Sequence, residues 1–482
     1  MRLVRLLLAS ALASPLALIE CGSDTSCDAD ASACTDASVV PGVSGGGCDS
    51  SKPASQGGCA VDDTDGYFVS PAGNDANDGS KATPFETIGK GILASAGNAQ
   101  RPNVYVCAGS YAENLVIQNA PAGVALHGGF DCASWAQVNA STVVAPAWQT
   151  GNTSQYVLHV LGAAAVVESM TLTAPDTTDP GASSIAAYVD GSEGMTFRRA
   201  TVTAGVGADA AQGTQQAAAA PNTSGAAAQN GNGVTTTCSC TSDTTIGGAG
   251  FSQQSDAGGP TAGEPVIPSD PDAGQPGTLT GICAGGTGAN GLPSTSNGAS
   301  TATLGGITSS GWVSSNGGPG GVGGTAQGGG GAYWSIASGL PGGGGGCGGC
   351  GGSGGAGGAG GGASIAIGAL TSTLRIQSST VRAGKAGNGA NGVAGQPGQP
   401  GGAGGNGGAC NGGNGGTGGQ GGAGGGGAGG VSVGIAFTPN NATPDVDAQS
   451  TVLAGTAGSG GHDATAQMNQ AIDGLAAPIH GF

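Results

Sequence analysis

The stretch TLTAP at Thr171–Pro175 returns thirty residues later as TVTAG at Thr201–Gly205. The same pattern, Thr-hydrophobic-x-Ala followed by Gly or Pro, also begins at Thr142, Thr380 and Thr451. The first three starts lie 29 and 30 residues apart, which is typical of one coil of a β-solenoid. A repeat this small cannot bury its own apolar face, so successive repeats must stack. The pattern therefore predicts an all-β fold, a parallel β-helix.

Longer gaps separate the later repeats. The starts at Thr201, Thr380 and Thr451 lie 179 and 71 residues apart, so subtracting one coil of 30 leaves inserts of about 149 and 41 residues. Glycine-rich stretches at 206–362 and 385–430 occupy these gaps. Each insert returns into an alternating strand, Ser364–Ile367 or Val431–Ile435, which corresponds to Ser184–Tyr188 in the uninterrupted coil. We therefore expect both inserts to leave the same corner of the solenoid.

Side-chain alternation along these repeats predicts which residues face inward. We expect one buried column of larger residues, a second buried column of alanines, and an outward position between them. The first column is Val143, Leu172, Val202, Val381 and Val452. The alanine column is Ala145, Ala174, Ala204, Ala383 and Ala454. The outward position is Val144, Thr173, Thr203, Arg382 and Leu453.

The segment before the repeats carries a more specific signature. It runs from Tyr67–Asp75 through Asn77–Ser80 to Pro84–Ile88. It resembles the N-terminal module, a domain of unknown function, of the right-handed parallel β-helix (pectate-lyase-like) superfamily. The resemblance covers about residues 67–132. It implies an opening strand, an Asp/Asn-Gly loop, a capping helix at Ile88–Ala96 and a first coil beginning near Val104.

Composition limits the function of the chain. Among 482 residues, 106 are glycine, only 8% are charged and the net charge is −18. Long stretches therefore cannot bury a conventional side-chain core. A chain this acidic lacks the basic surface of a nucleic-acid-binding protein, and an anionic membrane surface would repel it. We expect no nucleic-acid partner.

The second insert has a period of three. From Gly395 to Gly425 every third residue is glycine, except Cys410. Three residues per turn is the repeat of the polyproline II conformation. Collagen shares this repeat, but the segment is poor in proline outside Pro397 and Pro400. We favour packed polyglycine II strands, and a disordered glycine linker remains the alternative because glycine is costly to order. The runs also resemble the PGRS-type sequences of bacterial surface proteins.

The N-terminus predicts export. Arg2 and Arg5 precede an apolar run, Leu6–Ile19, which is too short to span a membrane and is typical of a signal peptide. The run ends at Leu18-Ile19-Glu20-Cys21, which resembles a bacterial lipobox although Glu20 departs from it. We expect Cys21 to be lipidated, so that only a lipid anchor holds the protein to the membrane. The alternative is an unlipidated secreted protein.

Thirteen cysteines indicate an oxidising compartment and disulfide bonds. Without Cys21 the number is even, and Cys107 and Cys132 are predicted to pair because each ends a strand-like segment in adjacent coils. Cys347 and Cys350 have the spacing of a redox or metal motif, but we favour structural disulfides for them. The other candidates in the inserts are Cys238, Cys240, Cys283 and Cys410, and those in the stalk are Cys27, Cys34, Cys48 and Cys59.

No cluster in the sequence satisfies the requirements of a catalytic site, and we assign no catalytic or cofactor-binding residue. A polysaccharide lyase or hydrolase on this fold would need carboxylates, basic residues and aromatics over one cleft, and Tyr188 and Phe197 are the nearest aromatics. The charged candidates are Glu168, Asp176, Asp179, Asp190, Glu193, Arg198 and Arg199. The four single histidines, His127, His159, His462 and His480, support no triad.

Two weaker signals remain. Asp75, Asn77 and Asp78 are possible calcium ligands, although turn hydrogen bonds are the more economical role for them. Thr171/Thr173 and Thr201/Thr203 could form an outward threonine ladder that orders water or ice, but the ladder is not continued by Val144, Arg382 and Leu453.

We therefore expect an exported, non-enzymatic protein of the outer membrane surface, or a secreted one, with a structural or adhesive role. Its partners would be cell-surface or extracellular polysaccharide or other envelope components, and the alternative is a carbohydrate-active β-helix enzyme. Its expected parts are a signal peptide (1–20), a stalk (21–66), the cap and first coils (67–205), the first insert (206–362), one coil (363–384), the second insert (385–430) and the last coil with its tail (431–482).

Overall fold

A computed structural model of the chain describes residues 61–138, 140–213, 235–241, 243–252, 258–408, 410–439, 443–464 and 469–482. All of these belong to one compact unit. The predictions for the signal peptide, for Cys21, and for Cys27, Cys34, Cys48 and Cys59 lie outside the described residues.

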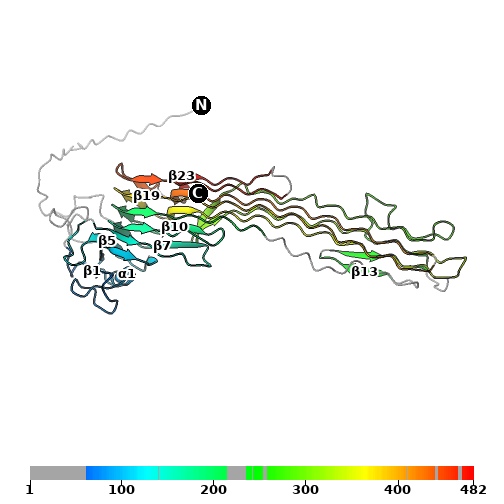
Figure 1. Cartoon of the computed structure of the whole chain (residues 1–482), viewed down its shortest axis with the longest axis horizontal. Coiled ribbons are helices and arrows are strands. Elements are labelled where there is room, and N and C mark those ends of the chain that lie inside the picture. Colours follow the sequence, from blue (N-terminus) through cyan, green and yellow to red (C-terminus); the bar gives the residue numbers. More distant parts are fainter. Residues whose placement is uncertain are drawn as a thin grey trace, which may run out of the picture. The chain divides into compact units, whose positions relative to one another are not determined.

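The described residues form a parallel β-helix with three sheets, here called A, B and C (Figure 1). Sheet A contains β1 (Gly66–Val69), β2 (Asn103–Cys107), β5 (Val124–Phe130), β8 (Ala165–Glu168), β11 (Met195–Arg198), β18 (Leu374–Gln377) and β21 (Asp445–Val446). Sheet B contains β3 (Gly109–Tyr111), β6 (Thr142–Val144), β9 (Thr171–Thr173), β12 (Thr201–Thr203), β19 (Thr380–Arg382) and β22 (Thr451–Leu453). Sheet C contains β4 (Leu115–Gln118), β7 (Ser154–Leu161), β10 (Ser183–Asp190), β17 (Ser364–Leu370), β20 (Ser432–Phe437) and β23 (Ala476–Gly481).

Helix α1 (Ile88–Ala96) closes the first coil, as the resemblance implied. Thr87 is its N-cap and accepts a hydrogen bond from the Lys90 amide. The Glu113 carboxylate accepts from the amides of Ile88 and Gly89, each at 2.9 Å. These bonds satisfy amide groups that have no partner within the helix, and they place a negative charge at its N-terminus, where it is stabilising.

The core is a set of columns whose members come from successive coils. On sheet A, Leu126, Val167, Phe197 and Ile376 pair in register, and each is fully buried. On sheet B, Leu172, Val202 and Val381 also pair in register, and Val452 continues the column. The repeat at Thr171, Thr201, Thr380 and Thr451 thus marks equivalent positions in one solenoid.

The predicted column is wrong in its first member. Val144, not Val143, pairs with Leu172 and is fully buried, while Val143 is only half-buried and pairs with Thr171. Ala145 shares this slip and is half-buried, whereas Ala174, Ala204 and Ala383 are buried. The cause is the length of this coil, which is one residue shorter than the motif alignment suggested. Because strand side chains alternate, a shift of one residue exchanges the inward and outward faces.

Both inserts leave after sheet B and return at the start of sheet C, so the prediction of a shared corner is confirmed. The first insert lies between β12 and β17, and the second between β19 and β20. The sequence analysis missed a third excursion, 454–475, which leaves after β22 and returns at β23. It also missed two antiparallel hairpins in the first insert, β13 (Thr236–Ser239) with β14 (Thr244–Gly247) and β15 (Gly305–Thr308) with β16 (Gly311–Ser314).

A ladder of buried serines holds this corner together. Ser184, Ser364 and Ser432 occupy the same position in successive strands of sheet C. The Ser364 hydroxyl donates to the Gly205 carbonyl and accepts from the Gly384 amide, both at 2.7 Å. Ser184 and Ser432 make the equivalent pairs of bonds, with Pro175 and Gly205 and with Gly384 and Gly455. Each return strand is therefore bonded to the points where two excursions or loops begin.

The described parts of the inserts within 235–300, 316–362 and 386–430 run side by side away from this corner, and we call them the glycine slab (Figure 1). Segment 410–430 bonds to four neighbours, although a sheet strand bonds to only two. Its first bonds are Gly412 to Gly405, Gly413 to Gly330, Gly343 to Cys410 and Gly285 to Asn411, all between backbone N–H and C=O groups. Each series repeats at every third residue, for example at Gly415, Gly416, Gly346 and Gly288. This three-residue pattern is the one predicted for polyglycine II.

Close packing explains why glycine is required inside the slab. A Cβ atom built on Gly416 would lie 2.0 Å from the Ala289 carbonyl oxygen, and one on Gly349 would lie 1.9 Å from that of Gln399. Residues at the third position instead point outward, as Asn391, Pro397 and Pro400 do.

Candidate functional site

Three side chains of sheet A and the arginine that follows the third of them form the most concentrated ionic cluster in the described residues. His127 ends up beside Glu168, and Glu168 beside Arg198, because β5, β8 and β11 pair in register. All three point away from the core, since their neighbours Leu126, Val167 and Phe197 point into it. Arg199 follows at the corner to sheet B. The sequence analysis considered Glu168, Arg198 and Arg199 but did not assign His127 to them.

Glu168 lies at the centre of this cluster. Its Oε2 is 2.7 Å from His127 Nδ1, and its Oε1 contacts the Arg199 guanidinium directly and Arg198 Nη1 at 3.7 Å. His127 also bonds Asn103 Oδ1 through Nε2 at 3.1 Å, and the Tyr105 ring stacks on it at 5.6 Å. Arg198 Nε donates to Gln377 Oε1 at 3.1 Å. With Asn103 and Gln377, the network spans five successive coils, from β2 to β18.

The charge state of Glu168 follows from two opposed effects. Burial raises the pKa of its carboxyl group, because the side chain is almost completely removed from water. The hydrogen bond to His127 and the electrostatic interactions with His127, Arg199 and Arg198 lower the pKa and outweigh the effect of burial. The pKa of Glu168 is therefore below its usual range, and the side chain is an anion at neutral pH.

This geometry limits the chemistry that Glu168 can perform. Both carboxylate oxygens are engaged and the side chain is only 2% exposed, so it cannot reach a substrate as a general base. Arg199 is the accessible member, with 34% of its side chain exposed. Its backbone has a positive φ of 48°, as does that of Ser169 at 53° and Ser378 at 47°. The left-handed turn is therefore a repeated property of this corner, which aims Arg199 back at Glu168.

The remaining carboxylate candidates lie elsewhere. Asp176 accepts from the Val206 amide, and Asp179 accepts from Trp148 Nε1 and the Gly151 amide, so both serve the corner between sheets B and C. Asp190 ends β10 in sheet C, and Glu193 is exposed in the following turn. Among the described residues, no group of three or more His, Cys, Asp or Glu side chains is arranged to hold a metal ion.

The predicted aromatics do not gather over the ionic cluster. Phe197 points into the core, and Tyr188 lies on sheet C. Tyr188 and Tyr156 stack at 5.1 Å beneath the β15–β16 hairpin. Their hydroxyls donate to the carbonyls of Thr308 and Ser310, the second at 2.7 Å. This face of sheet C is therefore covered by the first insert.

The three calcium candidates are occupied by turn hydrogen bonds. Asp75 accepts from the amides of Glu86 and Thr87, each at 2.9 Å, and from the Thr87 hydroxyl. Asn77 donates to the Pro84 carbonyl at 2.9 Å, and Asp78 accepts from the Ser80 amide at 3.1 Å. These are turn hydrogen bonds of the loop between β1 and α1, and calcium binding by these residues stays a prediction.

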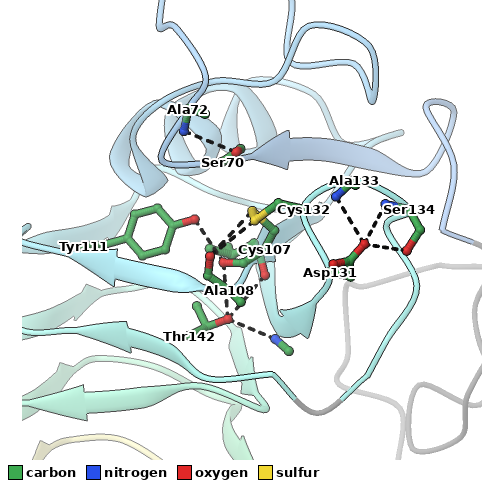
Figure 2. The surroundings of a disulfide bond; sticks show 12 residues. Ser70, Ala72, Cys107, Ala108, Tyr111, Asp131, Cys132, Ala133, Ser134 and Thr142 are labelled. Carbon is green, nitrogen blue, oxygen red and sulfur yellow. Dashed lines mark hydrogen bonds between the residues drawn. A yellow bond between two sulfur atoms is a disulfide. The ribbon is translucent and has the colours of Figure 1, made fainter.

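Four disulfide bonds are present in the described residues. Cys107 and Cys132 pair as predicted, with a Cα–Cα distance of 5.0 Å (Figure 2). The disulfide lies next to buried hydrogen bonds that the Tyr111 and Thr142 hydroxyls donate to the Cys107 carbonyl. Cys347 and Cys350 pair with Cys238 and Cys240 respectively, and not with each other. Cys283 pairs with Cys410 and joins the two inserts.

The threonine ladder is longer at one position than the sequence analysis recognised. Thr171, Thr201, Thr380 and Thr451 pair in register along sheet B. The second position has only Thr173 and Thr203 before Arg382 and Leu453 follow. Ordering of water or ice by this row stays a prediction.

Comparison with known protein families gives a match to part of the chain. The model of a family described as a protein of unknown function (DUF1565) matches residues 71–242, a little over a third of the chain, and that family is associated with parallel β-helix proteins. Neither the curated proteins nor the solved structures contain a match. No helix in the described part of the chain is both long and apolar enough to cross a membrane. The disulfides indicate an oxidising, exported environment.

Proposed function

We propose that this chain is a non-enzymatic scaffold of the bacterial cell envelope, with a structural or adhesive role and contact with surface polysaccharide. The glycine slab carries the proposal. Its segments are bonded backbone to backbone in several directions, and three disulfides cross-link them. Such a body resists unfolding without a side-chain core, which suits an extracellular spacer better than an enzyme.

Most of the slab surface also fits an uncharged partner, because its charged residues are confined to 243–272. No Asp, Glu, Lys, Arg or His occurs between Asp272 and Arg375, or between Lys385 and Asp445, although the chain carries a net charge of −18. Side chains such as Asn411, Thr417 and Gln420 project from the slab at three-residue intervals. Hydroxyl and amide groups at a regular spacing can hydrogen-bond the hydroxyl groups of a neutral polysaccharide.

Binding to insoluble polysaccharide tests the proposal directly. The full chain carrying Cys21→Ser would be mixed with cellulose, chitin or isolated cell-wall sacculi, and the depletion of protein from solution measured. We expect depletion by at least one of these and a fall when Asn411, Thr417 and Gln420 are replaced together by alanine. A matched triple replacement of exposed solenoid residues, Ser110, Asn114 and Glu193, should leave binding unchanged. Absence of binding to all three materials would remove the polysaccharide contact.

The anchor at Cys21 belongs to the same proposal. The apolar run and the lipobox-like sequence before Cys21 support it. In cells, the protein should fractionate with the outer membrane and label with a radioactive fatty acid, and Cys21→Ser should abolish both. Recovery of unlabelled wild-type protein from the medium would favour the secreted form instead.

A second function is favoured by one observation, the stack of His127, Glu168, Arg198 and Arg199 on the outer face of sheet A. A partly exposed guanidinium on a β-helix can bind an acidic sugar, so a carbohydrate-active enzyme acting on polyuronides remains the alternative. Incubation with polygalacturonate, with and without calcium, would show this activity as unsaturated products by ultraviolet absorbance. Lyase activity that is lost in Arg199→Ala would favour the enzyme over the scaffold. Absence of activity would mean that the cluster is a structural element.

A further inference from the structure

The end of the glycine slab farthest from the solenoid carries two adjacent turns, which we call the tip: Thr278–Cys283 and Tyr333–Leu340. The first turn closes through the Thr278 amide and the Ile282 carbonyl at 2.9 Å, and the second through the Ser335 amide and the Leu340 carbonyl at 3.0 Å. The Tyr333 amide donates to the Cys283 carbonyl at 2.8 Å, so the turns lie side by side. The Cys283–Cys410 disulfide ties the first turn to the second insert.

Large apolar side chains project from both turns. Ile282 is 79% exposed and Ile336 is 62% exposed, and Leu279 and Leu340 are each 45% exposed. Tyr333 and Trp334 lie half-buried at the base of the second turn. The Tyr333 ring packs against Phe251 at 5.0 Å, which fixes this base. Exposed apolar groups gathered in one place mark an interaction site more often than single ones do.

The tip is also free of ionisable groups. Neither turn contains a charged residue or a histidine, and Asp272 and Arg375 are the nearest in sequence on the two sides. A surface without charges can leave water without the large cost of desolvating an ion. The two turns of the tip can therefore enter an apolar medium without burying a charge.

We propose that the tip inserts shallowly into the surface of a lipid bilayer with zwitterionic headgroups. Its aliphatic residues project from convex turns, and a protein partner would have to supply a matching pocket for each, whereas fluid acyl chains need none. Tyr333 and Trp334 are half-buried and directly precede the second turn's exposed aliphatic residues, and aromatic residues of this kind form the interfacial belt of membrane proteins. The backbone groups of the turns cannot be left unpaired in hydrocarbon, which limits the insertion to the headgroup boundary.

The proposal deepens the adhesive role and takes its biological setting from the proposed function. The bonded segment from Gly343 to Gly361 separates the tip from the solenoid, and at about 3.1 Å per residue it holds the two roughly 55 Å apart. A chain anchored at one end and inserting at the other would bridge two lipid surfaces.

Vesicle flotation tests the insertion. The full chain carrying Cys21→Ser, so that no lipid anchor contributes, would be mixed with phosphatidylcholine vesicles and the bound fraction measured. We expect binding, a blue shift of tryptophan emission that Trp334→Phe removes, and at least tenfold weaker partitioning for the Ile282→Ser/Ile336→Ser double variant. The matched control is Leu292→Ser/Val322→Ser, which removes two aliphatic side chains, 58% and 60% exposed, from the slab outside the tip. This variant should bind as before.

Three results would overturn the proposal. One is no flotation of the protein with intact disulfides. Another is flotation that the tip and control variants reduce equally. The third is a dimer in sedimentation velocity that Ile282→Ser/Ile336→Ser dissociates, which would make the tip an interface between two copies. Hydrogen exchange of the variants shows whether they fold. Because polysaccharide depletion is measured without lipid, failure of the tip and failure of the proposed function are separate results.

Discussion

Cys283 and Cys410 form a disulfide across 127 positions of sequence, and this bond joins the first glycine-rich insert to the second. Backbone hydrogen bonds adjoin this disulfide. The Gly285 amide donates to the Asn411 carbonyl, and the Gly343 amide donates to the Cys410 carbonyl. The covalent link is therefore placed where the slab ends and where fraying would start.

The first prediction concerns this link. Cys283→Ser/Cys410→Ser should destabilise the slab by roughly 2–4 kcal/mol, because the disulfide restricts the unfolded loops and ordered glycine is entropically costly. Amides in 385–408 and 410–430 should then exchange faster with deuterium, measured by mass spectrometry. Cys107→Ser/Cys132→Ser is the control and should affect the early coils only. Complete exchange within the dead time in the oxidised wild type would show that the inserts are flexible tethers.

The second prediction concerns a glycine inside the slab. Gly416→Ala should be strongly destabilising, because the added Cβ would lie 2.0 Å from the Ala289 carbonyl oxygen and 2.5 Å from its carbon. Thr417→Ala, at the exposed next position, should change stability by less than about 0.5 kcal/mol. Thermal unfolding of the two variants checks this. Equal stabilities would mean that the slab does not pack as described.

The third prediction concerns Glu168. The pKa of Glu168 is lowered in the folded state, so its ionisation stabilises the fold above the unfolded pKa, and this contribution is lost as pH falls through the folded pKa. Glu168→Gln should cost about 3 kcal/mol at pH 7, because it leaves buried arginine charge uncompensated. The variant should also lose part of the pH dependence of stability below about pH 4.3. Chemical denaturation at several pH values measures both effects, with exposed Glu193→Gln as control. An unchanged pH profile in the Glu168 variant would show that the cluster is not ionic.

The fourth prediction distinguishes two neighbouring valines. Val144→Ala should cost about 2 kcal/mol, because it opens a cavity in the buried column between Tyr111 and Leu172. Val143→Ala, at a half-buried outward position, should cost less than about 1 kcal/mol. Denaturation midpoints of the two variants decide the register of this coil, and a larger loss for Val143→Ala would restore the register expected from the motif alone.

These valines also show how far sequence reasoning reached. Stacking, the shared corner of the inserts, the capping helix and the Cys107–Cys132 bond all follow from local patterns or from short repeats. The register of β6 does not, because both Val143 and Val144 are apolar and only the length of the coil selects between them. Aligning Val144 with Tyr111, its partner on β3, and not by the threonine motif, would have identified Val144 as the inward residue.

The ionic cluster could not be predicted from the sequence, for a different reason. His127, Glu168 and Arg198 stand 41 and 30 positions apart, and only the strand register brings them together. Glu168 and Arg198 could be placed on neighbouring coils from the 30-residue period. His127 lies on β5, in the same coil as the first repeat at Thr142, and a long connection between β5 and β6 puts it 41 residues before Glu168, so the 30-residue period did not connect it to the others.

The serine ladder has a consequence for how this protein can change its length. Ser364 and Ser432 stand where the two inserts return, and their hydroxyls bond to Gly205 and Gly384, where the inserts depart. The slab can therefore grow or shrink while the solenoid is left intact. Because its hydrogen bonds recur at every third residue, neighbouring segments keep their pairing only if they gain or lose residues together in threes. Related chains should thus differ in reach by steps of about 9 Å, three residues at about 3.1 Å each, and insertions of one or two residues should be confined to the turns.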